Sequence, residues 1–120
     1  MKYKMVVDGN PKAHDAYALL DLLNEHYDCD VTMTFSRARK GRANLIKQQF
    51  TVPQFALKRG ETYLHYYVIH EFTHCIGYRY HDSVFKAHER QLLALFGIKI
   101  DYARAYPKAL YANGEQVYKK

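Results

Sequence analysis

The sequence His-Glu-Phe-Thr-His at positions 70–74 constrains the fold of this chain more than any other stretch. On an α-helix, residues four apart lie about 40° apart around the axis and about 6 Å apart along it, so the imidazoles of His70 and His74 can converge on one ion. Glu71 lies roughly 100° round from His70, where its carboxylate flanks such an ion without ligating it. The spacing therefore predicts a helix that offers two metal ligands and a general base.

The residues around this motif predict the helix that the motif requires. Residues 61–69 are mostly apolar or aromatic and contain neither proline nor glycine, which is typical of a largely buried helix. Gly60 and Gly77 bracket the segment and are expected to set its ends. A second helix is predicted from Asp82 or Ser83, either of which can cap it, to a stop at Gly97.

A third ligand is needed if one coordination position is to stay open for water, and His81, at the start of the second helix, is the leading candidate. The alternatives are Glu89 and His88, which follow in that helix, and His88 could instead orient a ligand by a hydrogen bond. The metzincin pattern would place the third histidine at position 80, which is Tyr80, and would need a downstream methionine that the sequence lacks. A metzincin is therefore not expected.

With these elements the chain resembles the SprT-like family of zinc metallopeptidases. The resemblance is carried by the motif at 70–74, a short turn, a His-x-x-x-Phe-Lys start of the next helix at 81–86 and a leucine-rich stretch closing at Gly97. It covers roughly residues 30–97. The family usually has glycine after its third histidine, where this chain has Asp82. The chain resembles the bare catalytic core, because it lacks the cysteines for the C-terminal zinc ribbon that many members carry.

This resemblance implies a small zincin-like α+β domain that hydrolyses peptide bonds in proteins or peptides. In the mechanism that we expect, Glu71 accepts a proton from a water activated by Zn²⁺. The ion would be held by three imidazoles, those of His70, His74 and His81. The resemblance also makes proteins held on DNA a candidate class of substrate. An oxyanion stabiliser is expected as well, and the sequence does not choose among four candidates, which are Tyr78, Tyr80, Tyr106 and His88.

The length of 120 residues predicts a single domain over residues 1–120, with residues 98–120 as a C-terminal extension of the family core. No apolar run approaches the ~20 residues that cross a membrane, and the first residues do not resemble a signal peptide. We therefore expect a cytoplasmic protein without a membrane partner, with reduced cysteines, and we take it to be a monomer. Cys75 follows a ligand but should point away from the ion, into the core.

The net charge of +6 is compatible with a polyanion such as DNA as a partner. Cationic side chains are densest around Gly41, where the sequence has Arg37, Arg39, Lys40 and Arg42. The favoured interpretation of this cluster is a solvated hairpin loop. The alternative is a tip that contacts phosphates.

The segments before the motif predict a helix followed by a hairpin. Asn10 and Pro11 should open a helix whose apolar face extends to about residue 27. Residues 31–35 and 43–52 flank the basic loop and predict an antiparallel hairpin. Pro53 indicates that the second of these strands, continued through residues 55–57, lies at a sheet edge. By resemblance to zincins, that edge would hold an extended peptide substrate.

The tail predicts a second hairpin, over residues 109–118, because Asn113-Gly114 is a strong two-residue turn.

Two other functions compete with a peptidase. In one, zinc only holds the helices of a nucleic-acid-binding module together, but such a site needs a fourth protein ligand and no base. In the other, an inactive or self-inhibited zincin serves as an interaction domain, with the tail hairpin over its cleft.

Overall fold

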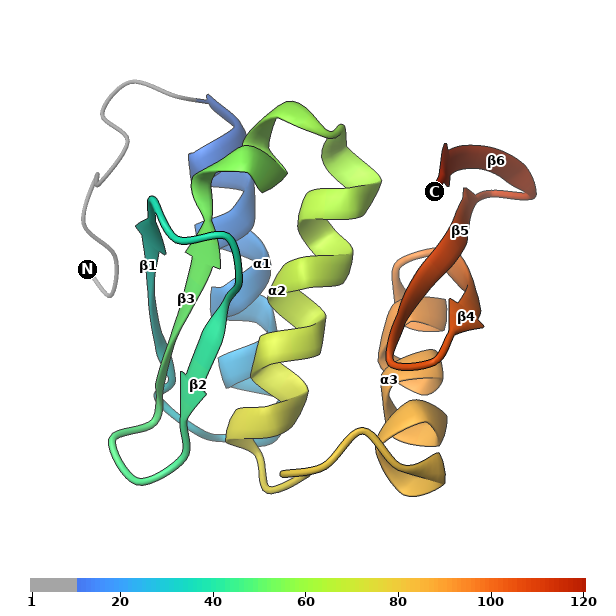
Figure 1. Cartoon of the computed structure of the whole chain (residues 1–120). Helices are drawn as coiled ribbons and strands as arrows, with labels where there is room; N and C mark the ends of the chain where they lie inside the picture. Colours follow the sequence, from blue (N-terminus) through green and yellow to red (C-terminus); the bar gives the residue numbers. More distant parts are fainter. Residues whose placement is uncertain (1–10) are drawn as a thin grey trace.

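Helix α2 (Glu61–Cys75) runs through the middle of the molecule, with one sheet on one side and a helix and a second sheet on the other (Figure 1). The structure is a computed structural model that describes residues 11–120, and within this range the chain forms an α+β domain with three α-helices and two three-stranded sheets. The other elements are α1 (Pro11–Tyr27), β1 (Thr32–Ser36), β2 (Arg42–Asn44), β3 (Gln49–Pro53), the 3₁₀ helix η1 (Gln54–Lys58), α3 (Ser83–Leu95), β4 (Ile98–Ala103), β5 (Tyr106–Ala112) and β6 (Glu115–Lys119).

The three predicted helices are confirmed, and their ends have the expected chemistry. Gly60 and Gly77 flank α2 with φ angles of 95° and 120°, which glycine adopts at little cost. Helix α3 begins after Asp82, whose side chain accepts a hydrogen bond from the backbone N–H of Phe85 at 2.9 Å. It ends before Gly97, which has a φ of 73°. The predicted cap of the first helix, Asn10, lies outside the described residues.

The predicted hairpin between residues 31–35 and 43–52 is wrong. The first sheet has the strand order β1-β3-β2, in which β3 pairs in parallel with β1 and antiparallel with β2. The second predicted strand is in fact β2 and β3, joined by the turn at residues 45–48. Strand β3 lies in the centre because Phe50 and Val52 need burial, whereas β2 offers only Ala43 between two exposed polar residues.

The edge predicted from Pro53 is wrong as well, because β3 pairs on both sides and the edge beside α2 is β2. The proline is tolerated because β2 pairs only with Gln49, Phe50 and Thr51, so Pro53 lies beyond that ladder. The predicted continuation of the strand through residues 55–57 is the 3₁₀ helix η1. Residues 37–41 do not close a hairpin but carry the chain from β1 past β3 to β2.

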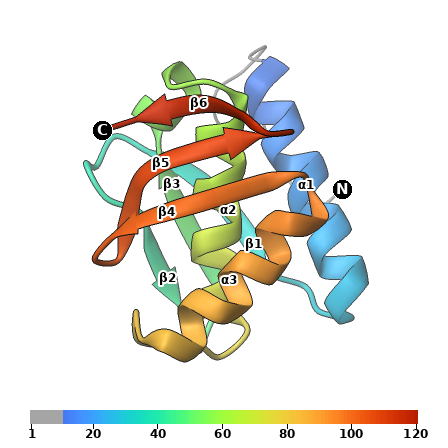
Figure 2. The ribbon, with the colours of Figure 1, turned by 90° about the vertical axis from the view of Figure 1, so that its right-hand side faces the viewer.

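The second sheet has the antiparallel order β4-β5-β6 and lies across α2, next to α3 (Figure 2). The predicted hairpin at the end of the chain is confirmed, since β5 and β6 are joined by Asn113 and Gly114 with φ angles of 53° and 85°. Two successive positive φ angles are what a type I′ turn requires. Strand β4, which the sequence analysis did not predict, joins this hairpin to α3.

One hydrophobic cluster joins both layers. Its largest fully buried members include Tyr17 of α1, Phe50 of β3, Tyr66 and Phe72 of α2, Leu92 of α3 and Leu110 of β5. Every residue of α2 from Tyr66 to Cys75 is buried, which explains the almost uninterrupted apolar and aromatic sequence before the motif. Cys75 is 3% exposed, as expected of a core thiol, and burial raises its pKa to about 12. Among the described residues no helix has the length and apolar character to cross a bilayer.

Asn24 connects α1 to the first sheet. Its side chain is 1% exposed, accepts a hydrogen bond from the backbone N–H of Val31 at 2.8 Å and donates one to the carbonyl of Val31 at 2.9 Å. These bonds satisfy both backbone groups of a residue that is itself fully buried. The amide therefore fixes the point where the chain leaves α1 and enters β1.

We expect Asn24→Ala to lower the free energy of unfolding by roughly 2–4 kcal/mol, because it leaves a buried N–H and a buried carbonyl unpaired. Urea unfolding followed by circular dichroism measures the loss. Glu25→Ala, at the exposed neighbouring position, is the control and should change stability by about 0.5 kcal/mol or less. Equal stability of the Asn24 and Glu25 variants would contradict the role of the amide.

Candidate metal centre

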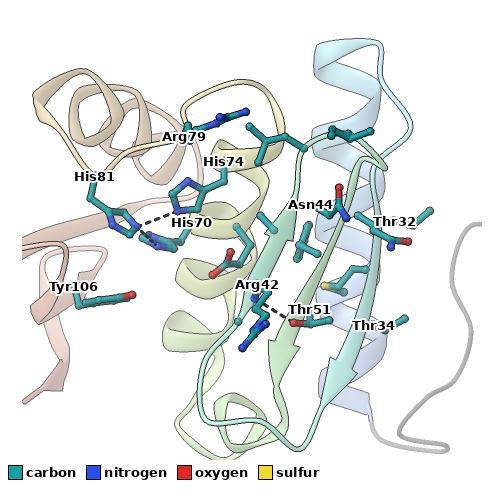
Figure 3. A pocket seen from close by; sticks show the side chains of 18 residues that line it. Thr32, Thr34, Arg42, Asn44, Thr51, His70, His74, Arg79, His81 and Tyr106 are labelled. Carbon is teal, nitrogen blue, oxygen red and sulfur yellow. Dashed lines mark hydrogen bonds between the residues drawn. The ribbon is translucent and has the colours of Figure 1, made fainter.

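Three imidazole rings converge where α2 meets the start of α3 (Figure 3). The Nε2 atom of His81 lies 3.0 Å from Nε2 of His74 and 3.1 Å from Nε2 of His70. A tetrahedral zinc site with Zn–N bonds of about 2.0–2.1 Å would place its ligand nitrogens roughly 3.3 Å apart. The three nitrogens are thus spaced as ligands of one small ion, and no residue of the described range outside these three joins the group.

The outer nitrogens of two of these rings are already paired. Nδ1 of His70 lies 2.7 Å from Oε2 of Glu89, and Nδ1 of His74 lies 2.7 Å from the carbonyl oxygen of Tyr78. Both oxygens are acceptors, so each Nδ1 carries the hydrogen and each Nε2 presents a lone pair to the other rings. A hydrogen on His81 Nε2 could only be shared between two lone pairs, whereas a metal ion satisfies all three nitrogens together.

Glu89 is held on both of its oxygens. It is fully buried, and while Oε2 accepts from His70, Oε1 accepts from the hydroxyl of Tyr102 at 2.5 Å. Burial is the main cause that raises the pKa of Tyr102, and the neighbouring carboxylate of Glu89 raises it further. The hydroxyl therefore stays protonated and remains a hydrogen-bond donor. Tyr102 belongs to β4, so the second sheet helps to orient a histidine of α2.

Burial keeps two of the three rings neutral. It lowers the pKa of His74 to about 4; the hydrogen bond that Nδ1 donates to the carbonyl oxygen of Tyr78 opposes this change, and the nearby His70 and His81 rings add to it. Burial, followed by the proximity of His70, also lowers the pKa of His81, the most exposed of the three. Neutral imidazole is the form that binds metal, so no proton has to be displaced from these rings near neutral pH.

The carboxylate of Glu71 faces the same space. It is 5% exposed, and burial raises its pKa to about 7, with Glu89 adding to the rise and His70 opposing it. Gly41 allows the chain to pass this carboxylate closely. A Cβ at position 41 would lie 2.8 Å from Oε2 of Glu71 and 2.6 Å from the carbonyl oxygen of Thr51, so no other residue fits there.

The centre opens into a cleft of about 830 Å³. Its lining comes from all three strands of the first sheet, the motif of α2, the loop between α2 and α3 and the start of β5. Edge strand β2 forms one wall. His81 and Tyr106 lie on the opposite side, where the side chain of Tyr106 points from β5 into the cleft (Figure 3).

The structure separates the other candidate residues. Glu89 contacts a histidine instead of joining the group of ring nitrogens, and His88 lies away from it, with Nε2 2.8 Å from the hydroxyl of Tyr27. The ring of Tyr78 stacks on His88 with centroids 4.7 Å apart, and Tyr80 is 70% exposed outside the cleft lining. Of the four oxyanion candidates, only Tyr106 lines the cleft.

Within the basic cluster, Arg42 lines the cleft, whereas Arg37, Arg39 and Lys40 are exposed in the preceding loop and do not.

Sequence reasoning missed two residues of the centre, Gly41 and Tyr102. Gly41 could have drawn attention as the only glycine within the basic cluster. Nothing in the sequence links Tyr102 to Glu89, because their contact depends on how β4 packs.

No family model matches this chain, and comparison with curated proteins and with solved structures gives no match either. The functional interpretation therefore depends on the geometry of the site and on the resemblance of its motif.

We expect Glu89→Gln to weaken zinc binding roughly tenfold, because an amide makes the imidazole of His70 less basic and holds it less firmly. Competition with a chromophoric zinc chelator measures the affinity. Glu115→Gln, at an exposed position of β6, should bind zinc as the unmodified protein does. Unchanged affinity of the Glu89 variant would show that the hydrogen bond does not support a metal site.

Proposed function

We propose that the protein is a zinc-dependent peptidase. The proposal is carried by one observation, the convergence of three Nε2 atoms beside the buried carboxylate of Glu71 at an open cleft. Catalytic zinc sites use three protein ligands and leave a fourth position open, whereas structural sites close that position with a fourth side chain. Three converging imidazoles with no fourth ligand in the described part of the chain match the catalytic pattern.

In the mechanism that we propose, His70, His74 and His81 would hold the ion. When bound, zinc would acidify a water molecule and polarise the carbonyl of the scissile peptide bond. Glu71 accepts the proton of the attacking water and then delivers it to the departing amine. Burial raises the pKa of this carboxyl to about 7 in the metal-free site, and a bound cation would favour its ionised form, which is the form that accepts a proton.

Tyr106 is the side chain best placed to donate a hydrogen bond to the oxygen that becomes negative. Its ring centroid lies 5.6 Å from that of His70 and 5.7 Å from that of His81. Its hydroxyl has no hydrogen-bond partner within residues 11–120, so it is free to donate to a substrate. Such a donor stabilises charge that develops only in the transition state.

Strand β2 provides a place for an extended substrate. It is the edge of the first sheet, and Gly41, Arg42, Ala43 and Asn44 all line the cleft next to the motif. A peptide that pairs with this edge would lie along the wall opposite His81. The zincin mode of substrate binding expected from the resemblance is therefore proposed for β2, in place of the strand that contains Pro53.

The two competing functions fit the site less well. A purely structural zinc leaves the buried Glu71 without a purpose, since burying a carboxylate costs free energy. Self-inhibition by the tail would need the hairpin of β5 and β6 in the cleft, but of residues 98–120 only Tyr106 lines it. A SprT-like affiliation, DNA-held substrates, a monomeric state and a cytoplasmic location remain predictions.

We expect Glu71→Gln to abolish most peptide hydrolysis, by about a hundredfold or more, while one zinc ion per chain is retained, because the base is lost and the ligands are kept. Casein cleavage and metal analysis of the same preparation provide the two readouts. His81→Ala should lose metal and activity together. Hydrolysis by the Glu71 variant at the unmodified rate would refute the proposed mechanism.

We expect Tyr106→Phe to lower kcat roughly a hundredfold and to leave KM nearly unchanged, because the lost hydrogen bond forms only in the transition state. Tyr111→Phe, which removes a hydroxyl further along β5 that contacts Asp101, is the matched control. A rise in KM with an unchanged kcat would instead make Tyr106 a residue that only binds substrate.

A further inference from the structure

The charges along the cleft are of one sign apart from the catalytic base. Arg42 and Arg79 both line it, and within residues 11–120 Glu71 is the only carboxylate of the lining. In the proposed reaction Glu71 takes up and releases a proton, so it does not form a permanent ion pair with either arginine. A substrate that enters the cleft therefore meets two cations and no fixed anion.

Both guanidinium groups are exposed and free to bind. No carboxylate within residues 11–120 forms an ion pair with Arg42 or Arg79. By contrast, Arg59 and Arg90 lie over aromatic rings, with their Cζ atoms 4.6 Å from the ring centre of Phe55 and 5.0 Å from that of Tyr102. The two cleft arginines are thus cations whose pairing capacity is unused.

Their positions are related to the reacting centre. Arg42 belongs to edge strand β2, and Arg79 belongs to the loop between α2 and α3. In the view of Figure 3, His70 and His74 lie between the two arginines. An extended peptide that follows β2 past the metal centre would then have one guanidinium on each side of its scissile bond.

The loop before β2 strengthens the positive potential at one end. Arg37, Arg39 and Lys40 are exposed and lie two to five residues before Arg42, whereas Arg79 has no comparable run of cations beside it in the sequence. A guanidinium pairs with a carboxylate through two parallel hydrogen bonds, which favours acidic side chains over other polar ones.

We propose that the cleft selects acidic segments of polypeptide. Arg42 and Arg79 would each bind the carboxylate of an aspartate or glutamate, one on each side of the scissile bond. This inference rests on the proposed peptidase function and names its substrate class. An exposed pair of this kind changes affinity by about two- to fivefold for each carboxylate, and the effect should shrink as salt screens the charges.

The first test is cleavage-site profiling. The zinc-loaded protein digests an equimolar library of synthetic peptides with randomised sequence, and mass spectrometry identifies the cleaved bonds. We expect aspartate and glutamate to be enriched on both sides of these bonds at low salt. No enrichment, or enrichment of lysine and arginine, would overturn the proposal.

Charge-reversal variants show which side of the scissile bond each arginine contacts. Arg42→Glu should replace the acidic preference by a basic one on one side of the bond, and Arg79→Glu should do so on the other. Lys99→Glu, an equal charge change at an exposed position of β4 outside the cleft, should leave the profile unchanged. A change on the same side in both variants, or an equal change in the control, would contradict the assignment.

A binding measurement separates recognition from turnover. Zinc-loaded Glu71→Gln protein is titrated with fluorescein-labelled peptides that carry either four glutamates or four glutamines, and anisotropy reports binding. Tighter binding of the glutamate peptide supports the inference even if no peptide is cleaved, in which case only the peptidase function fails. Equal binding of both peptides would overturn the inference of an acidic substrate. If a single-stranded oligonucleotide then bound tightly through the same two arginines, the cleft would be a nucleic-acid surface instead.

Discussion

The burial of ionisable side chains beside a hydrophobic core is the constraint on which this structure depends. Glu71, Glu89, His70 and His74 are all nearly inaccessible to water, and each would be costly to bury alone. The cost is offset by specific contacts, since Glu89 binds His70 and the carbonyl of Tyr78 binds His74. Helix α3 has to pack against α2 in one position for the contact between Glu89 and His70 to form, so the packing of the two helices and the geometry of the centre depend on each other.

The second sheet contributes more to this arrangement than its place at the end of the chain suggests. Tyr102 of β4 completes the hydrogen bonding of Glu89, Tyr106 of β5 faces the imidazoles, and the ring of Tyr118 in β6 lies 4.8 Å from that of Tyr63 in α2. Each strand therefore places one tyrosine against α2 or α3. Residues 98–120 are part of the site, although the resemblance of the sequence ends at residue 97.

The sequence predicted what depends on local geometry and missed what depends on how distant segments pack. The spacing of His70 and His74, the glycines around α2 and the Asn113-Gly114 turn act within a few residues, and the helices and the last hairpin were predicted from them. The pairing of β1 with β3 is decided by which strand most needs burial, and the extended character predicted for residues 43–52 does not reveal that. Pro53 was misleading because β2 is too short to reach it, so that Pro53 is paired only with Ser36 of β1. Likewise, His81 could be proposed from its place in the sequence, but the choice of Tyr106 required the fold.

Gly41 has a consequence for any attempt to redesign the cleft. Because a Cβ at this position would lie 2.8 Å from Oε2 of Glu71 and 2.6 Å from the carbonyl oxygen of Thr51, the wall of the cleft packs closely beside the buried carboxylate only while residue 41 is glycine. Mutagenesis that aims at a new ligand preference can vary Arg42 and Asn44, whose side chains are exposed, without displacing strand β2. A side chain at position 41 would have to displace the carbonyl of Thr51 or the carboxylate of Glu71, so a redesign that keeps the present geometry of the cleft has to keep this glycine.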